Sequence, residues 1–166
     1  LTIADSNISV SDTQGVGAFI ANVDSMTTIT LENCRLVNST VSGERVGGLI
    51  GWTSGYNNQN DGPVDTTVTV KNCSVVDSTV NATKSAGAII GHAGANPATY
   101  HFIKNCKVEN VTLNGEYKGL LIGTANVGQV IADNNVLSGN VTNFVGRYAL
   151  GDKGKVTING TSYTGE

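Results

Sequence analysis

The fold is decided by the stretch Thr66-Thr-Val-Thr-Val-Lys-Asn-Cys73, because the chain repeats it. Thr27-Thr-Ile-Thr-Leu-Glu-Asn-Cys34 comes before it and Thr99-Tyr-His-Phe-Ile-Lys-Asn-Cys106 after it, and weaker copies lie at Leu1–Asn7 and Gln129–Asn135. Polar and apolar residues alternate in each copy, which predicts a β-strand with one buried face. The Asn that ends each strand favours a tight turn.

Each copy is followed by an apolar stretch bounded by small residues. The five stretches are Gly17-Ala-Phe-Ile-Ala21, Gly47-Gly-Leu-Ile-Gly51, Gly87-Ala-Ile-Ile-Gly91, Gly119-Leu-Leu-Ile-Gly123 and Gly146-Arg-Tyr-Ala-Leu-Gly151. A two-part pattern that recurs at intervals of roughly 30 to 40 residues indicates a solenoid of stacked coils. In the second copy, strands are expected at about 28–32, 35–41 and 46–52.

We therefore predict one all-β domain over residues 1–166, a right-handed parallel β-helix (β-solenoid) of about five three-stranded coils stacked about 4.8 Å apart. A β-propeller is the alternative, although its blades are longer and carry four strands. The sequence does not begin with Met, so we expect a fragment of a larger protein, with flanking domains or self-association capping the open ends of the coils.

The composition agrees with this fold and excludes other classes. Glycine is abundant, with 21 residues, and only 14% of residues are charged, which disfavours a helical bundle. The net charge of −3 leaves no basic surface for nucleic acid, so no nucleic-acid partner is expected. No apolar run reaches the roughly 18 residues of a membrane helix, so no membrane insertion is expected.

Val46-Gly-Gly-Leu-Ile-Gly51, preceded by a strand that ends in Asn-Cys, resembles the GLUG-motif repeat. This repeat occurs in large secreted or surface proteins of bacteria, including adhesin-like proteins. The resemblance covers nearly the whole chain, is closest at Gly47–Gly51 and Gly119–Gly123, and is weaker at Gly146–Gly151. It implies an extracellular or cell-surface location and a repeat scaffold, and it supplies no catalytic residues.

Stacking places equivalent residues of successive repeats in columns. One column is charged and is expected outside: Asp5, Glu32, Lys71, Lys104 and Asp133. The next is expected to form a corner ladder of hydrogen-bonded amides: Ser6, Asn33, Asn72, Asn105 and Asn134. The third is Asn7, Cys34, Cys73, Cys106 and Asn135, in which three buried free thiols are favoured over a mixed disulfide or a metal site. His101 takes the place of inward apolar residues and should be buried.

The longest insertion, 52–65, supplies most of the candidate binding residues. Trp52 and Tyr56 are expected to stack on sugar rings, and Asn57, Asn58, Asp61 and Asp65 to bond sugar hydroxyls. The column after the glycine stretches, Asn22, Trp52, His92, Thr124 and Asp152, adds His92 to this edge. A solvated loop and a Ca²⁺ loop are the alternatives, but the spacing of a calcium-binding loop is missing, so no metal or cofactor is predicted.

The acidic residues are scattered, and no paired carboxylates or nucleophile motif stand out, so we expect no enzymatic activity. We predict a non-catalytic surface domain that binds a glycan or a protein partner through the loops of one edge. A purely structural stalk is the first alternative and a polysaccharide-degrading enzyme the second. Ice binding by Thr28 and Thr30 over Thr67 and Thr69 is a further class, limited by the short array.

Overall fold

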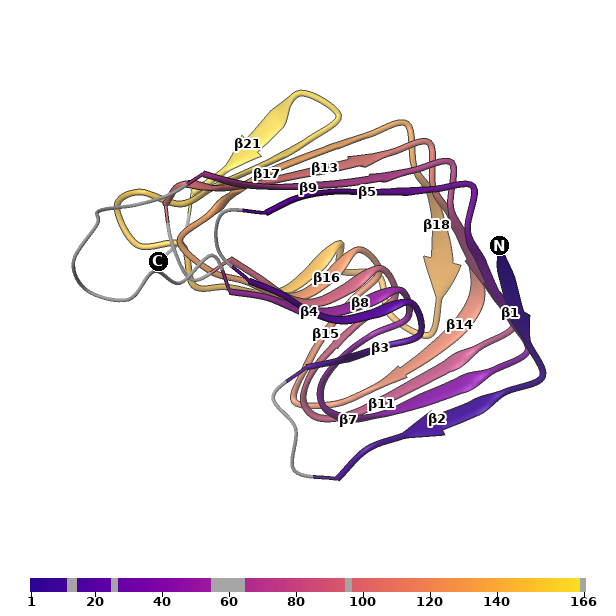
Figure 1. Ribbon diagram of the computed structural model, residues 1–166. Helices are drawn as coiled ribbons and strands as arrows, with labels where there is room; N and C mark the ends of the chain where they lie inside the picture. Colours follow the sequence, from indigo (N-terminus) through magenta and orange to yellow (C-terminus); the bar gives the residue numbers. More distant parts are fainter. Residues whose placement is uncertain (12–14, 25–26, 55–64, 95–96, 165–166) are drawn as a thin grey trace.

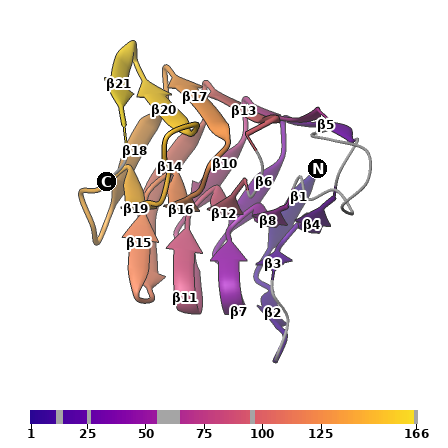
Figure 2. The same ribbon diagram turned by 90° about the vertical axis from the view of Figure 1, so that its left-hand side faces the viewer.

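The computed structural model of the chain describes residues 1–11, 15–24, 27–54, 65–94 and 97–164. Across these ranges the chain forms β-strands and no helix, which confirms the all-β prediction. Strands of successive repeats lie side by side and curl into a solenoid-like stack, seen along the stack in Figure 1 and from the side in Figure 2. Nothing in the described residues could cross a membrane as a helix.

The first sheet is built from the repeated Thr-rich strands. Its members are β5 (Thr28–Glu32), β9 (Thr66–Lys71), β13 (Thr99–Lys104), β17 (Gln129–Asp133), β20 (Lys155–Ile158) and β21 (Thr161–Tyr163). They lie in the order β21-β20-β17-β13-β9-β5, so β5 is one edge of this sheet. Neighbours pair in parallel, apart from the β20–β21 hairpin.

The second sheet bends around a corner of the stack. Its members are β1 (Thr2–Ala4), β2 (Asn7–Ser9), β3 (Val16–Gly17), β6 (Arg35–Val37), β7 (Thr40–Gly47), β10 (Ser74–Val76), β11 (Thr79–Gly87), β14 (Lys107–Asn114), β15 (Tyr117–Gly119) and β18 (Val136–Gly139). This sheet forms two walls of the stack. Strands β6, β10 and β14 pair in parallel in one wall, and β7, β11 and β14 pair in parallel in the other, so β14 belongs to both walls. Figure 1 shows these two walls meeting at an angle.

The third sheet lies inside the bend of the second. Its members are β4 (Ile20–Val23), β8 (Ile50–Thr53), β12 (Ile90–Ala93), β16 (Ile122–Ala125) and β19 (Val145–Tyr148). The ends of β7, β11 and β15 turn back toward the interior, and the strands of the third sheet run beside them (Figure 1). Glycine allows this close approach: a Cβ on Gly87 would overlap the carbonyl oxygen of Ile90. The glycine-bounded stretches are therefore packing elements.

The register confirms that equivalent residues stack. Leu31 lies opposite Val70, Val70 opposite Ile103, and Ile103 opposite Ala132. Val70, Ile103 and Ala132 are fully buried, as predicted for an inward column. His101 replaces the valines of the neighbouring inward column and is 1% exposed, which confirms its predicted burial.

The corner ladder was predicted in the right place but with the wrong bonds. Asn33, Asn72 and Asn105 follow one another at the corner after the first sheet, each with a φ of 55–56°. Asn tolerates this left-handed conformation better than other side-chain-bearing residues. In the described residues no hydrogen bond joins their side-chain amides. The backbone links them instead, since Asn33 N donates to the Lys71 carbonyl and Asn72 N to the Lys104 carbonyl.

A second corner, which the sequence analysis missed, carries the side-chain ladder. Asn38 Nδ2 donates to Asp5 Oδ1 at 2.6 Å, and Asn110 Nδ2 donates to Asp77 Oδ1 at 3.0 Å. All four residues have positive φ. The repeats that contain β5, β9 and β13 therefore each turn two outer corners with the same device, an Asn or Asp in the left-handed region.

At several corners the residue after the left-handed Asn or Asp has a side chain that hydrogen-bonds to the backbone of a neighbouring repeat. Ser39 N donates to Ser78 Oγ at 3.2 Å, and Cys34 N lies 3.4 Å from Cys73 Sγ. Cys106 N donates to Asn135 Oδ1 at 2.8 Å, so Asn135 continues this column as predicted. The three cysteines are buried and free of disulfides in the structure, in agreement with the favoured expectation.

Three predicted features of the repeat were wrong: the number of strands in a unit, and the alignments of the first and last copies. The unit 27–54 contains four strands, β5 to β8, where three were expected, because the Asn38 corner divides 35–41 and Gly48–Leu49 divides 46–52. The weak first copy aligns with the second strand of the unit: Thr2 pairs with Arg35 and Asn7 with Thr40. Asn7 therefore lies outside the cysteine column.

The third difference concerns the alignment of the last copy. Val145 pairs with Ile122 and Arg147 with Thr124, so Gly146 takes the place of Gly123. A Cβ on Gly146 would overlap the Lys118 amide nitrogen, and this close packing decides the register. Arg147, and not Asp152 as predicted, therefore follows Thr124 in the column of candidate site residues.

Candidate functional site

Four of the seven predicted binding residues, Tyr56, Asn57, Asn58 and Asp61, lie outside the described residues. Asp65 is described and exposed, directly before β9. Trp52 on β8 and His92 on β12 are register partners, so the structure brings these two together as predicted.

The two rings form an edge-to-face pair. Their centroids lie 6.1 Å apart and their planes meet at 83°. The guanidinium of Arg45 lies 5.5 Å from the centroid of the Trp52 ring, within the range of a cation–π contact. Trp52 is half-buried, and its indole Nε1–H is buried with no hydrogen-bond partner in the part of the chain that the structure describes. The ring is thus fixed in position with an unused donor.

His92 is held neutral by its surroundings. Burial, with a smaller effect of the nearby Arg45 and Arg147 charges, lowers its pKa to about 4. Its Nδ1 is buried and has no hydrogen-bond partner among the described residues. A neutral imidazole and an indole therefore form a pair in which each ring has a polar atom without a described partner.

The column of Trp52 and His92 continues along the stack with Thr124 and Arg147. These four residues are called the Trp52 row below. Thr124 Oγ1 lies 2.7 Å from Ser85 Oγ, which belongs to the facing wall. The Arg147 guanidinium lies 4.9 Å from the centroid of the Tyr117 ring. Cationic and aromatic side chains thus meet at Trp52 and at Arg147.

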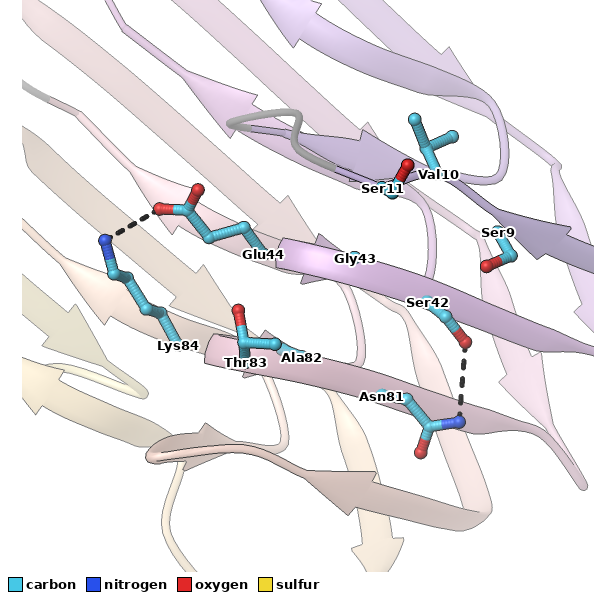
Figure 3. A pocket seen from close by; sticks show the side chains of 10 residues that line it. All are labelled: Ser9, Val10, Ser11, Ser42, Gly43, Glu44, Asn81, Ala82, Thr83 and Lys84. Carbon is cyan, nitrogen blue, oxygen red and sulfur yellow. Dashed lines mark hydrogen bonds and ion pairs between the residues drawn. The ribbon is translucent and has the colours of Figure 1, made fainter.

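A groove lies on the outer face of β7 and β11. It has a volume of about 620 Å³, and Figure 3 shows its lining: Ser9, Val10, Ser11, Ser42, Gly43, Glu44, Asn81, Ala82, Thr83 and Lys84. Asn81 Nδ2 donates to Ser42 Oγ at 3.4 Å, and Lys84 Nζ donates to Glu44 Oε1 at 2.8 Å. Hydroxyl, amide, ammonium and carboxylate groups therefore line one open surface.

Glu44 connects the groove to the row. Its Oε1 lies 2.8 Å from both Lys84 Nζ and Arg45 Nη1, and Arg45 contacts Trp52. The hydrogen bond from Lys84, with the charge of Arg45, holds the pKa of the Glu44 carboxyl below its usual value. The carboxylate thus positions one cation over the groove and the other over the indole.

Glu44, Arg45 and Lys84 were not predicted from the sequence. A signal for them exists: Glu44-Arg45 and Lys84-Ser85 each stand one residue before a glycine-bounded stretch, in equivalent places of two repeats. This signal places the charges in neighbouring repeats of one wall. Their position near Trp52 depends on the turn at Gly48–Leu49, which the repeat pattern does not reveal.

The second histidine belongs to the core. Burial lowers the pKa of His101 to about 4. Its Nδ1 lies 3.2 Å from the Gln129 carbonyl oxygen, so Nδ1–H donates there and the Thr53 hydroxyl, 2.7 Å from Nε2, donates to the ring. Within the described part of the chain, no three His, Cys, Asp or Glu side chains are grouped as metal ligands would be.

A second hollow lies at the C-terminal end of the stack. It has a volume of about 730 Å³ and is lined by Arg147, Tyr148, Ala149, Ser162, Tyr163 and Thr164. Tyr148 and Tyr163 stack with ring centroids 5.7 Å apart. Because these rings pack against the last inward residues, they close the core at this end.

Comparisons of the chain with protein-family models, with curated proteins and with solved structures find no match.

Proposed function

We propose that this chain is a non-catalytic, adhesin-like repeat domain of a bacterial secreted or cell-surface protein that binds a glycan. The proposal extends to the fold: the stacked strands close as a right-handed parallel β-helix of about five coils. The resemblance of Val46–Gly51 to the GLUG repeat supports the location, and the stacked columns support the scaffold.

One observation carries the binding function, the contact of Glu44, which lines the groove on β7 and β11, with Arg45, whose guanidinium lies over the Trp52 ring. Sugars present hydroxyls around an apolar ring face, so their sites combine donors and acceptors with an aromatic side chain. Here Ser42, Asn81 and Glu44 supply the first kind of group, and Trp52 supplies the second. The parallel strands hold these groups in place before binding, which lowers the entropy lost on association.

A glycan array tests the proposal with the wild-type domain, Trp52→Ala and Asn81→Ala. We expect at least one retained glycan and a loss of about ten-fold or more in affinity for each variant, equivalent to about 1.4 kcal/mol. Tyr100→Ala is the matched control, since Tyr100 is an exposed aromatic residue on β13, in another sheet. Retention of no glycan, or equal losses for Trp52→Ala and Tyr100→Ala, contradicts the proposal.

A structural stalk is the second candidate, and the corner ladders favour it. The bonds Asn38–Asp5, Asn110–Asp77 and Ser39–Ser78 all join successive repeats and none points to a ligand. In a stalk the groove residues would be solvated surface groups. The array experiment separates the two candidates, because a stalk retains no glycan.

A further inference from the structure

Of the strands that the structure describes, β5 is the edge of the first sheet at the N-terminal end of the stack, and its inward side chains are incompletely covered. Among the described strands its single neighbour is β9. Ile29 and Leu31 are only half-buried, whereas Val68 and Val70, their register partners on β9, are fully buried. The difference follows from position, since β9 is covered on both sides and β5 on one.

The other strands of the same repeat, β6, β7 and β8, do have a neighbour on this side. Strand β1 pairs with β6, β2 and β3 pair with β7, and β4 pairs with β8. Among the described residues, the layer that contains β1 to β4 therefore has no strand beside β5. An unpaired strand edge of this kind is a template for a further strand.

The position of Leu1 fixes how such a strand would lie. Thr2 pairs with Arg35, so Leu1 lies level with Cys34, and the Leu1 ammonium donates to the Asn33 carbonyl at 3.4 Å. Leu1 itself is 80% exposed. A residue placed before Leu1 would stand beside Asn33, and the strand before that residue would run parallel to β5.

We propose that the edge of β5 is a docking site for one parallel β-strand with the alternation of the repeat itself. Its apolar side chains lie beside Ile29 and Leu31, and its outward side chains lie beside Thr28, Thr30 and Glu32. The inward column that begins at Leu31 continues with buried apolar residues in β9, β13, β17 and β20: Val70, Ile103, Ala132 and Ile158. An added strand that continues this column therefore needs an apolar residue beside Leu31. The inference is independent of the proposed glycan binding.

The copy of Thr66–Asn72, Thr-Thr-Val-Thr-Val-Lys-Asn, joined directly before Leu1 tests the proposal, because this linkage sets the register. Its two valines then lie beside Ile29 and Leu31, and its lysine beside Glu32. Amide hydrogen exchange should slow by about ten-fold or more at Thr28–Glu32 and not at β19, at the opposite end. The midpoint of thermal unfolding should rise by roughly 3 °C or more.

Two controls keep the test specific. The same extension with one glycine inserted before Leu1 shifts the strand by one residue and turns its valines outward. An extension with serine in place of both valines keeps the register and loses the apolar contacts. Equal protection of β5 by all three extensions, protection by none, or protection that requires a high protein concentration overturns the proposal.

Discussion

The amide nitrogen of Cys34 lies 3.4 Å from the Sγ of Cys73 in the next repeat. The serine corner has the same arrangement, with Ser39 N donating to Ser78 Oγ at 3.2 Å. Cys73 Sγ and Ser78 Oγ also both donate to the carbonyl oxygen two residues before them, at 3.3 and 2.7 Å. The buried thiols therefore serve as hydrogen-bonding corner residues in addition to filling space.

This relationship predicts that Cys73→Ser is tolerated better than Cys73→Val. Serine keeps an acceptor for the Cys34 amide, whereas valine leaves that buried N–H without a partner, at a cost of about 1–3 kcal/mol. Urea denaturation followed by circular dichroism gives the two free energies of unfolding. If Cys73→Val is as stable as Cys73→Ser, sulfur makes no hydrogen bond of consequence here.

The conformation of Asn72, with φ of 55°, predicts the effect of two other substitutions. Asn72→Gly should leave the free energy of unfolding nearly unchanged, because glycine adopts this conformation without strain. Asn72→Val should lower it by about 1–2 kcal/mol, because a Cβ approaches the neighbouring carbonyl oxygen. Thermal unfolding of both variants checks this, and a stable Asn72→Val protein would show that the corner can change its backbone conformation.

Gly87 predicts a large destabilisation on gaining a single methyl group. In Gly87→Ala the Cβ overlaps the Ile90 carbonyl oxygen, backbone that cannot move aside without separating β11 from β12. We expect a loss of about 3 kcal/mol or more. Gly115→Ala is the matched control, since its Cβ would lie 3.2 Å from the nearest atom, the Lys84 carbonyl oxygen. Similar losses for both variants would argue against close packing of the glycine stretches.

The core of the stack was predictable from the sequence because the repeated pattern lies within short segments of the chain. The strong copies ending at Cys34, Cys73 and Cys106 share both alternation and a corner residue, so their columns align without coordinates. The first and last copies were misaligned because their similarity is short. There, the Asp5–Ser6 corner and the packing of Gly146 decide the register, and both are tertiary constraints.

The candidate site was only partly predictable for the same reason. Trp52 and His92 share a column, so the repeat placed them together. Arg45 reaches Trp52 from the facing wall because the chain turns back at Gly48–Leu49, and the sequence period does not reveal that turn. The side-chain contacts between two walls depend on the direction of this bend.

The buried His101 predicts that stability falls in mild acid. The pKa of a histidine in the unfolded chain is about 6.5, and burial lowers that of His101 to about 4 in the fold. Between these values the unfolded state binds more protons, so the free energy of unfolding decreases as the pH is lowered from about 6.5 to 4. The loss should reach about 3 kcal/mol for this one group.

Urea denaturation at several pH values measures this loss, and His101→Val isolates the share of His101. Valine is the residue found at the neighbouring positions Val68 and Val130 of the same column. The variant should keep the pH dependence due to His92, whose pKa is also lowered to about 4. An unchanged pH profile would show that His101 is hydrated in the fold.

The contact between Trp52 and His92 predicts the fluorescence of the single tryptophan. Because burial lowers the pKa of His92 to about 4, the emission should stay constant from pH 8 to pH 5 and fall with a midpoint near 4, when the imidazolium quenches the indole. His92→Phe is the control, since it keeps an aromatic ring at this position and cannot titrate. Circular dichroism at each pH separates quenching from unfolding. A midpoint near 6.5 would mean that His92 is solvated and that the row is open to water at its centre.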